Sequence, residues 1–107
     1  ITMGSGLGHR GRAFSAPYCV SKAGLWMLTR VLAQELSDAR ISVNELIPGP
    51  VRTDMGQTCS RNGRSAFSIP GEWVKEPEDV VSLAVFLAGQ PDIGPTAQSF
   101  SLMRRDL

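Results

Sequence analysis

The stretch from Ala16 to Gly49, APYCVSKAGLWMLTRVLAQELSDARISVNELIPG, contains the signals that decide the fold. Apolar residues recur along its first part at helical spacing, in two stripes, which predicts a helix over residues 16–36. Residues 41–47 then form an apolar run that a Pro-Gly pair closes, which is typical of a strand. Because the helix has two apolar stripes, we expect it to be buried on two sides, by its own sheet and by another helix or subunit.

Outside this stretch, strands, loops and helices continue to alternate. The predicted strands cover residues 1–5, 41–47 and 98–102, the helices 16–36 and 77–88, and the loops 6–17 and 50–76. Alternation of this kind favours an α/β fold with a parallel sheet. We therefore expect a partial Rossmann-like sheet of three strands with two main helices.

Composition and charge argue against several classes of function. The 107 residues suffice for one small domain, and 42% hydrophobic with 20% charged residues indicates a globular protein. A net charge of +1 gives no electrostatic reason to expect nucleic acid or a membrane surface as a partner. No apolar run reaches the roughly 18 residues that a membrane helix needs.

The cysteines and the histidine fit no metal motif. Cys19, Cys59 and His9 lack the spacing and the number of ligands, about four, of a zinc site. Two free thiols suit a reducing compartment, so we expect a cytoplasmic protein. The chain begins Ile1-Thr2-Met3, which resembles the end of a strand, so we expect the amino-terminal half of the domain to be missing from it.

Tyr18 and Lys22 lie four residues apart in the predicted helix and therefore share one of its faces. The pKa of a free phenol is about 10, too high for a good general acid or base at neutral pH. A nearby ammonium lowers that pKa because it stabilises the phenolate. The pair has the chemistry of a general acid/base. An ordinary surface pair is the alternative interpretation of Tyr-x-x-x-Lys.

Two more candidate sites follow predicted strands, and ligands bind at the strand ends of parallel sheets. Ser5 precedes Tyr18 by thirteen residues and has a hydroxyl that suits a substrate carbonyl. Residues 48–53, PGPVRT, leave the second strand sharply and would turn the Thr53 hydroxyl toward the same edge. Turn-forming residues without a ligand are the alternative in both places.

Together these features resemble the short-chain dehydrogenase/reductase family. The matches are the Ser-to-Tyr spacing, Tyr-x-x-x-Lys followed by Ala23-Gly24, and VNELIPG at 43–49 followed by Thr53, with PEDV at 77–80, FLA at 86–88 and TAQ at 96–98. The resemblance covers nearly the whole chain. It implies that residues 1–107 are the carboxy-terminal portion of a single Rossmann-type domain.

The resemblance also implies an activity, which is hydride transfer between NAD or NADP and a small carbonyl or alcohol substrate. Tyr18 would be the general acid/base. Lys22 would favour the phenolate and bind the nicotinamide ribose, and Ser5 would hold the substrate oxygen. Family members commonly form homodimers or homotetramers. The loop after residue 53 would cover the substrate, whose identity the sequence leaves open.

The same resemblance assigns residues to the cofactor. Pro48, Gly49 and Val51 would line the nicotinamide, and Thr53 would bond its carboxamide or the phosphates. The family's glycine-rich cofactor loop and the upstream asparagine of its catalytic set are not in this sequence. Most of the cofactor site is therefore expected to lie outside the chain.

The chain departs from the family near both ends. Thr2-Met3-Gly4-Ser5 stands where the family more often has Asn and paired serines. Met103-Arg104-Arg105 stands where many members have an acid and two glycines, which argues against the tail's usual role in closing over the substrate.

Two other interpretations stay open. One is a truncated, catalytically silent protein that acts only by association through the helix around Trp26, Met27 and Leu28. The other is a stand-alone nucleotide-binding module on Gly6-x-Gly8-x-x-Gly11. Residues 12–17 separate these glycines from the predicted helix, so the third glycine is not expected to pack that helix on the strand.

Overall fold

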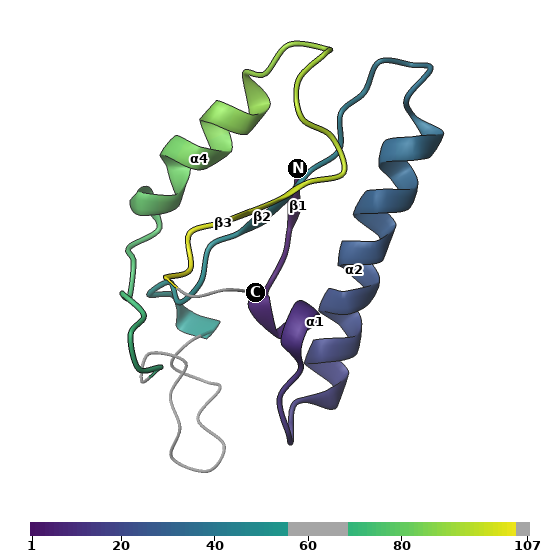
Figure 1. Cartoon of the computed structure of the whole chain (residues 1–107). Helices are drawn as coiled ribbons and strands as arrows, with labels where there is room; N and C mark the ends of the chain where they lie inside the picture. Colours follow the sequence, from purple (N-terminus) through teal and green to yellow (C-terminus); the bar gives the residue numbers. More distant parts are fainter. Residues whose placement is uncertain (56–68, 105–107) are drawn as a thin grey trace.

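The computed structural model describes residues 1–55 and 69–104, and in this part of the chain a three-stranded parallel sheet lies between helices (Figure 1). The elements in chain order are β1 (Thr2–Met3), α1 (Gly6–Arg10), α2 (Ala16–Glu35), β2 (Glu45–Ile47), α4 (Glu78–Ala88) and β3 (Ser99–Ser101). Helix α2 covers one face of the sheet and α4 the other, while α1 lies beyond the end of β1, beside the start of α2. The predicted α/β class and three-stranded parallel sheet are confirmed.

The central strand is β2, which pairs with β1 on one side and β3 on the other. Thr2 and Ser99 both lie opposite Glu45 in the register of the sheet. All three residues of β2 are buried, because helices cover the sheet on both faces. Leu46 and Ile47 form the centre of the core, and Glu45 is a charged residue in the same buried strand.

Helix α2 rests on the sheet through Thr29 and Ala33, both of which are buried. The Thr29 hydroxyl donates to the carbonyl of Leu25 at 2.8 Å, and its oxygen lies 2.6 Å from the hydroxyl oxygen of Thr2 on β1. This pair of hydroxyls joins the helix to the edge strand. Away from the sheet, α2 carries four exposed apolar residues, Val20, Met27, Leu28 and Val31.

Helix α1 corrects the prediction of a loop over residues 6–17. It is capped by Ser5, whose side-chain oxygen accepts the Leu7 N–H at 3.2 Å, and Gly11 ends it with φ 72°. A serine cap satisfies one of the first-turn N–H groups that a helix leaves without a partner. Because glycine weakens helices, the glycine-rich sequence of this segment does not predict a helix.

Strand β2 covers only Glu45–Ile47, whereas the sequence predicted a strand over 41–47. Before Glu45, hydrogen bonds that involve side chains replace part of the backbone pairing. The Val43 N–H donates to the Thr96 hydroxyl at 3.1 Å, and the Asn44 side chain donates to the Pro95 carbonyl at 2.6 Å. The Asn44 side-chain oxygen also accepts the N–H of Gln98 at 3.1 Å. These bonds attach the segment before β2 to the segment before β3.

Part of the predicted loop 50–76 is described. Val51 and Lys75 form an isolated parallel bridge, which brings the two ends of that loop together. Cys59, the Arg61–Arg64 pair and Arg105 lie outside the described residues. No helix of the described ranges is long and apolar enough to cross a membrane.

Candidate active site

Tyr18 and Lys22 lie one turn apart near the start of α2. The Lys22 Nζ donates a hydrogen bond to the carbonyl oxygen of Met3 at 2.9 Å and lies 5.8 Å from the centroid of the Tyr18 ring. Met3 is the last residue of β1, so this bond fastens the start of α2 to the end of the strand. An ammonium has three N–H donors, and the bond to Met3 engages one of them. Tyr18 is 41% exposed and therefore accessible to a ligand.

Ser5 follows β1 by two residues, at the strand end that the sequence predicted. Its side-chain oxygen acts as an acceptor toward the Leu7 N–H, so the cap does not use the hydroxyl proton. The same hydroxyl is thus able to donate to a second oxygen. Ser5 and Lys22 both lie at the carboxyl end of β1, because Lys22 is bonded to the residue two positions before Ser5, and Tyr18 precedes Lys22 by one turn of α2.

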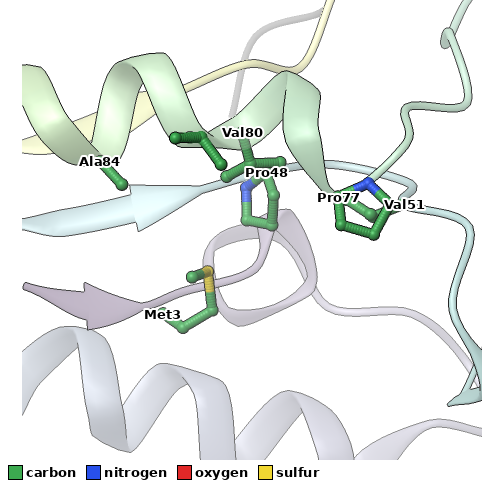
Figure 2. A pocket seen from close by; sticks show the side chains of 7 residues that line it. Met3, Pro48, Val51, Pro77, Val80 and Ala84 are labelled. Carbon is green, nitrogen blue, oxygen red and sulfur yellow. The ribbon is translucent and has the colours of Figure 1, made fainter.

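The carboxyl end of β2 leads into the Pro48-Gly49 turn, where Gly49 has φ 72°, in the left-handed region that favours glycine. Pro48 and Val51 help to line an apolar groove of about 330 Å³ (Figure 2). The other lining residues are Met3, Pro77, Val80, Val81 and Ala84. Met3 is shared by both parts of the site: its side chain lines the groove, while its carbonyl accepts the bond from Lys22.

The other two predicted cofactor residues lie outside the lining of this groove. A Cβ added at Gly49 would be 3.3 Å from both the Lys75 Nζ and the Met103 Cγ, so Gly49 lies beneath these two side chains. Thr53 is exposed. The structure therefore places Pro48 and Val51 on one apolar surface and puts Gly49 and Thr53 elsewhere on the same turn.

The tail is attached to the segment that follows the long loop. The Arg104 guanidinium lies 3.8 Å from the centroid of the Trp73 ring, and the Arg104 N–H donates to a Glu72 carboxylate oxygen at 3.1 Å. With Met103 close to Gly49, this attachment holds the tail, up to Arg104, beside the turn that follows β2.

The three glycines of the G-x-G-x-x-G motif shape α1. Gly6 begins the helix, Gly11 ends it, and a Cβ added at Gly8 would lie 2.7 Å from the backbone carbonyl carbon of Lys22. The residues after Gly11 separate the motif from α2, which begins at Ala16, and a Cβ added at Gly11 would meet no heavy atom within 4 Å. Gly11 therefore packs no helix on the strand, as the sequence predicted. Gly8 instead allows α1 to contact the backbone of α2.

A buried polar cluster of His9, Glu45 and Ser99 was missed by sequence reasoning. One oxygen of the Glu45 carboxylate accepts from the His9 Nε2 at 2.9 Å and from the Ser99 hydroxyl at 2.5 Å. The side chains of His9 and Glu45 are only 12% and 1% exposed. A signal was available, since a single charge inside the apolar run 43–47 requires a partner once the strand is buried.

No group of three or more His, Cys, Asp or Glu side chains in residues 1–55 and 69–104 is arranged to hold a metal ion. Cys19, on α2, is a free thiol.

Comparison with known proteins assigns the family. The sequence profile described as enoyl-(acyl carrier protein) reductase matches residues 1–101. The chain is 37% identical over 101 residues to a 3-oxoacyl-(acyl-carrier-protein) reductase, FabG, of Chlamydia pneumoniae, a match that covers 92% of this chain and 41% of that protein. It is 43% identical over 74 residues to a short-chain type dehydrogenase/reductase of Picea abies, covering 66% of this chain and 27% of the relative. The chain belongs to the short-chain dehydrogenase/reductase family.

Solved structures of short-chain dehydrogenases and related proteins share the fold. A blue fluorescent protein from a metagenomic library, in complex with NADPH, matches with a TM-score of 0.76 and 31% identity over 94% of this chain and 42% of that one. A short-chain dehydrogenase from Mycobacterium paratuberculosis, bound to NAD, matches with a TM-score of 0.74 and 30% identity over 95% and 42%. The chain spans about two fifths of the length of the first reductases it matches.

Thr2 and Gly4 have specific structural roles at β1 and directly after it. The Thr2 hydroxyl bonds to Thr29 on α2. A Cβ added at Gly4 would lie 1.9 Å from the Oε1 of Glu45. The glycine thus leaves the space that the buried carboxylate occupies.

Proposed function

We propose that this chain is the carboxy-terminal portion, within a single Rossmann-type domain, of an NAD(P)-dependent oxidoreductase that interconverts a carbonyl and an alcohol. The observation that supports it most is the hydrogen bond from Lys22 to the Met3 carbonyl, because this bond joins the residue one turn after Tyr18 to the strand end that precedes Ser5. The family assignment and the NADPH- and NAD-bound structures of similar proteins support the same activity.

Each of these side chains has a separate task in the reduction of a carbonyl. Tyr18 donates its phenolic proton to the carbonyl oxygen as that oxygen becomes a hydroxyl. Ser5 donates a hydrogen bond to the same oxygen from its hydroxyl, which the helix cap leaves available, and so holds that oxygen in place. The Lys22 ammonium lies 5.8 Å from the centroid of the Tyr18 ring, beside the phenolate that Tyr18 becomes. In the oxidation direction the proton moves back to Tyr18.

The turn that follows β2 would hold the nicotinamide end of the cofactor. When bound, NAD(P) supplies or accepts the hydride. Pro48 and Val51 offer an apolar surface for a flat ring, and the Lys22 N–H groups not directed at Met3 suit ribose hydroxyls. Gly49 permits the turn, and the exposed Thr53 hydroxyl is available to the carboxamide or the phosphates.

The names of the relatives suggest the first substrates to test. Several are 3-oxoacyl-(acyl-carrier-protein) reductases that are 32 to 37% identical to this chain. A 3-oxoacyl thioester is therefore the first carbonyl compound to try. The free thiol of Cys19 suits a reducing, cytoplasmic setting.

The test is a chimera in which the amino-terminal part of the Chlamydia pneumoniae reductase precedes this chain. We expect the chimera to oxidise NADPH in the presence of a 3-oxoacyl thioester, and the 107-residue chain alone to show no measurable hydride transfer. Tyr18→Phe should lower kcat by about 10²- to 10⁴-fold, the usual contribution of a general acid. Ser21→Ala, which removes a different exposed hydroxyl from the same turn, is the matched control. Full activity of the Tyr18→Phe chimera would refute the acid/base role.

A second candidate function is association without catalysis. It is favoured by the exposed apolar stripe of α2, formed by Val20, Met27, Leu28 and Val31. A second copy packed on this stripe would bury it on the side away from the sheet, giving a homodimer or homotetramer. The intact mass of the native protein separates the two candidates. A mass near 11.5 kDa favours the silent protein, and a markedly larger one favours the enzyme.

A further inference from the structure

We propose that His9 and Glu45 are positioning residues that hold α1, and with it the Ser5 hydroxyl, at the end of the sheet. The inference rests on the substrate-binding role proposed for Ser5. It adds that the position of this hydroxyl depends on the central strand β2, through the His9–Glu45 bond.

Helix α1 depends on outside contacts for its position. It has five residues, and isolated helices shorter than about 12–15 residues are marginal in water. Gly8 places α1 against the backbone of α2. The bond from the His9 Nε2 to Glu45 then connects the last turn of α1 to β2. Contacts with α2 and with β2 therefore fix the position of α1.

Glu45 is a fixed anchor for this connection. Its N–H donates to the Gln98 carbonyl at 2.9 Å, and its carboxylate also accepts the Ser99 hydroxyl from β3. The backbone at Gly4 leaves no spare space beside the carboxylate, since even a Cβ would overlap with it. The carboxylate therefore has little freedom to follow α1 if the helix moves.

His9 is held from its other side as well. Its ring lies against Trp26 of α2, with the ring centroids 4.8 Å apart. A buried carboxyl group without a donor is strongly unfavourable, so the bond from His9 is expected to persist. Ser5 precedes His9 by four residues, about one helical turn. A rotation or shift of α1 would therefore move the Ser5 hydroxyl, and the His9–Glu45 bond opposes such a movement.

The first experiment uses the fact that His9 is the only histidine in the sequence. Labelling histidine with ¹⁵N gives NMR signals from this ring alone. We expect a protonated Nε2 at neutral pH, with a ring proton that exchanges with water far more slowly than that of a free imidazole. An unprotonated Nε2, or a ring proton that exchanges as fast as in free histidine, would overturn the proposal without any variant.

The second experiment measures amide hydrogen exchange in variants of the whole chain. His9→Leu removes the donor, and His9→Gln keeps an N–H at a similar reach. In His9→Leu we expect exchange of the Leu7 amide, which bonds to Ser5, to rise at least about tenfold relative to amides inside α2, as expected for local opening. His9→Gln should bring the rate back to within about threefold of the parent chain.

Two outcomes would count against a positioning role. The first is an exchange rate at the Leu7 amide that is unchanged in His9→Leu. The second is an equal acceleration of the amides of α2 and β2, because that would indicate general destabilisation of the chain. If His9→Leu fails to fold, His9→Asn replaces it: its shorter side chain ends before the Glu45 carboxylate, and the Leu7 amide should again accelerate ahead of α2. These readouts require no substrate, so a failure of the oxidoreductase assay and a failure of the positioning proposal remain distinguishable.

Discussion

Replacing Gly4 by alanine tests the packing around the buried carboxylate directly. The added Cβ would lie 1.9 Å from the Oε1 of Glu45 and 2.4 Å from its Cδ and Cγ. These separations are far below van der Waals contact, so either the strand or the carboxylate has to move. The carboxylate is bonded to His9 and Ser99, and its displacement strains or breaks both bonds.

The size of the effect follows from these two consequences. Overpacking a core typically costs about 1–3 kcal/mol, and leaving a buried charge without its partner costs about 3–5 kcal/mol. Because the displaced carboxylate retains part of its bonding, we expect the free energy of unfolding to fall by about 3 kcal/mol. That is a large part of the roughly 5–15 kcal/mol that stabilises a typical domain.

The assay is urea unfolding followed by far-UV circular dichroism. The matched control is Gly24→Ala, in the middle of α2, because a Cβ there meets no heavy atom within 4 Å. Alanine is favoured over glycine inside a helix by about 0.5–1 kcal/mol. The same chemical change is therefore expected to stabilise the chain at Gly24 and to destabilise it at Gly4.

A double-mutant cycle with Glu45→Ala isolates the cause. Once the carboxylate is removed, Gly4→Ala should change the unfolding free energy by less than about 1 kcal/mol, which gives a coupling energy near 2 kcal/mol, within the range for residues in contact. Equal effects in the two backgrounds would refute this reasoning, as would a Gly4→Ala chain as stable as the parent.

Two further predictions concern α1. Gly8→Ala places a Cβ 2.7 Å from the backbone of Lys22, so α1 must separate from α2. We expect the free energy of unfolding to fall by about 2 kcal/mol in the same urea assay, within the range for overpacking. An unchanged urea midpoint would contradict this prediction. Ser5→Ala removes the cap on Leu7 and should cost about 1 kcal/mol. Ser5→Asp keeps an acceptor and should retain that stability, but it lacks the hydroxyl proton and should leave the chimera inactive.

Much of the fold could be predicted because its elements have strong local signals. Apolar periodicity predicted a helix over 16–36, and α2 covers Ala16–Glu35. Proline and acidic residues marked the start of the helix predicted at 77–88, where α4 covers Glu78–Ala88. Parallel pairing followed from the alternation of strands and helices, and it is observed in all three strands.

The features that were missed depend on contacts between distant residues. Helix α1 has a glycine-rich sequence, and its stability comes from the Ser5 cap and from packing on α2, neither of which produces a periodic pattern. His9 and Glu45 are 36 residues apart, so no local pattern links them. At the candidate site, the sequence indicated that Ser5, Tyr18 and Lys22 lie near one strand end, but not that Lys22 bonds to Met3. The roles of these residues in catalysis stay predictions.

The two parts of the candidate site differ in what organises them. Ser5 and Lys22 are held by bonds within this chain, Lys22 to Met3 and Leu7 to Ser5, and we propose that His9 and Glu45 add a third. The apolar groove has walls from β1, the turn after β2 and α4. Met3 is the residue that the two parts share, because its side chain lines the groove and its carbonyl accepts the bond from Lys22. A ligand that binds the groove should therefore slow amide exchange at Leu7, even in a chain that transfers no hydride, and unchanged exchange at saturation would show that the two parts are independent.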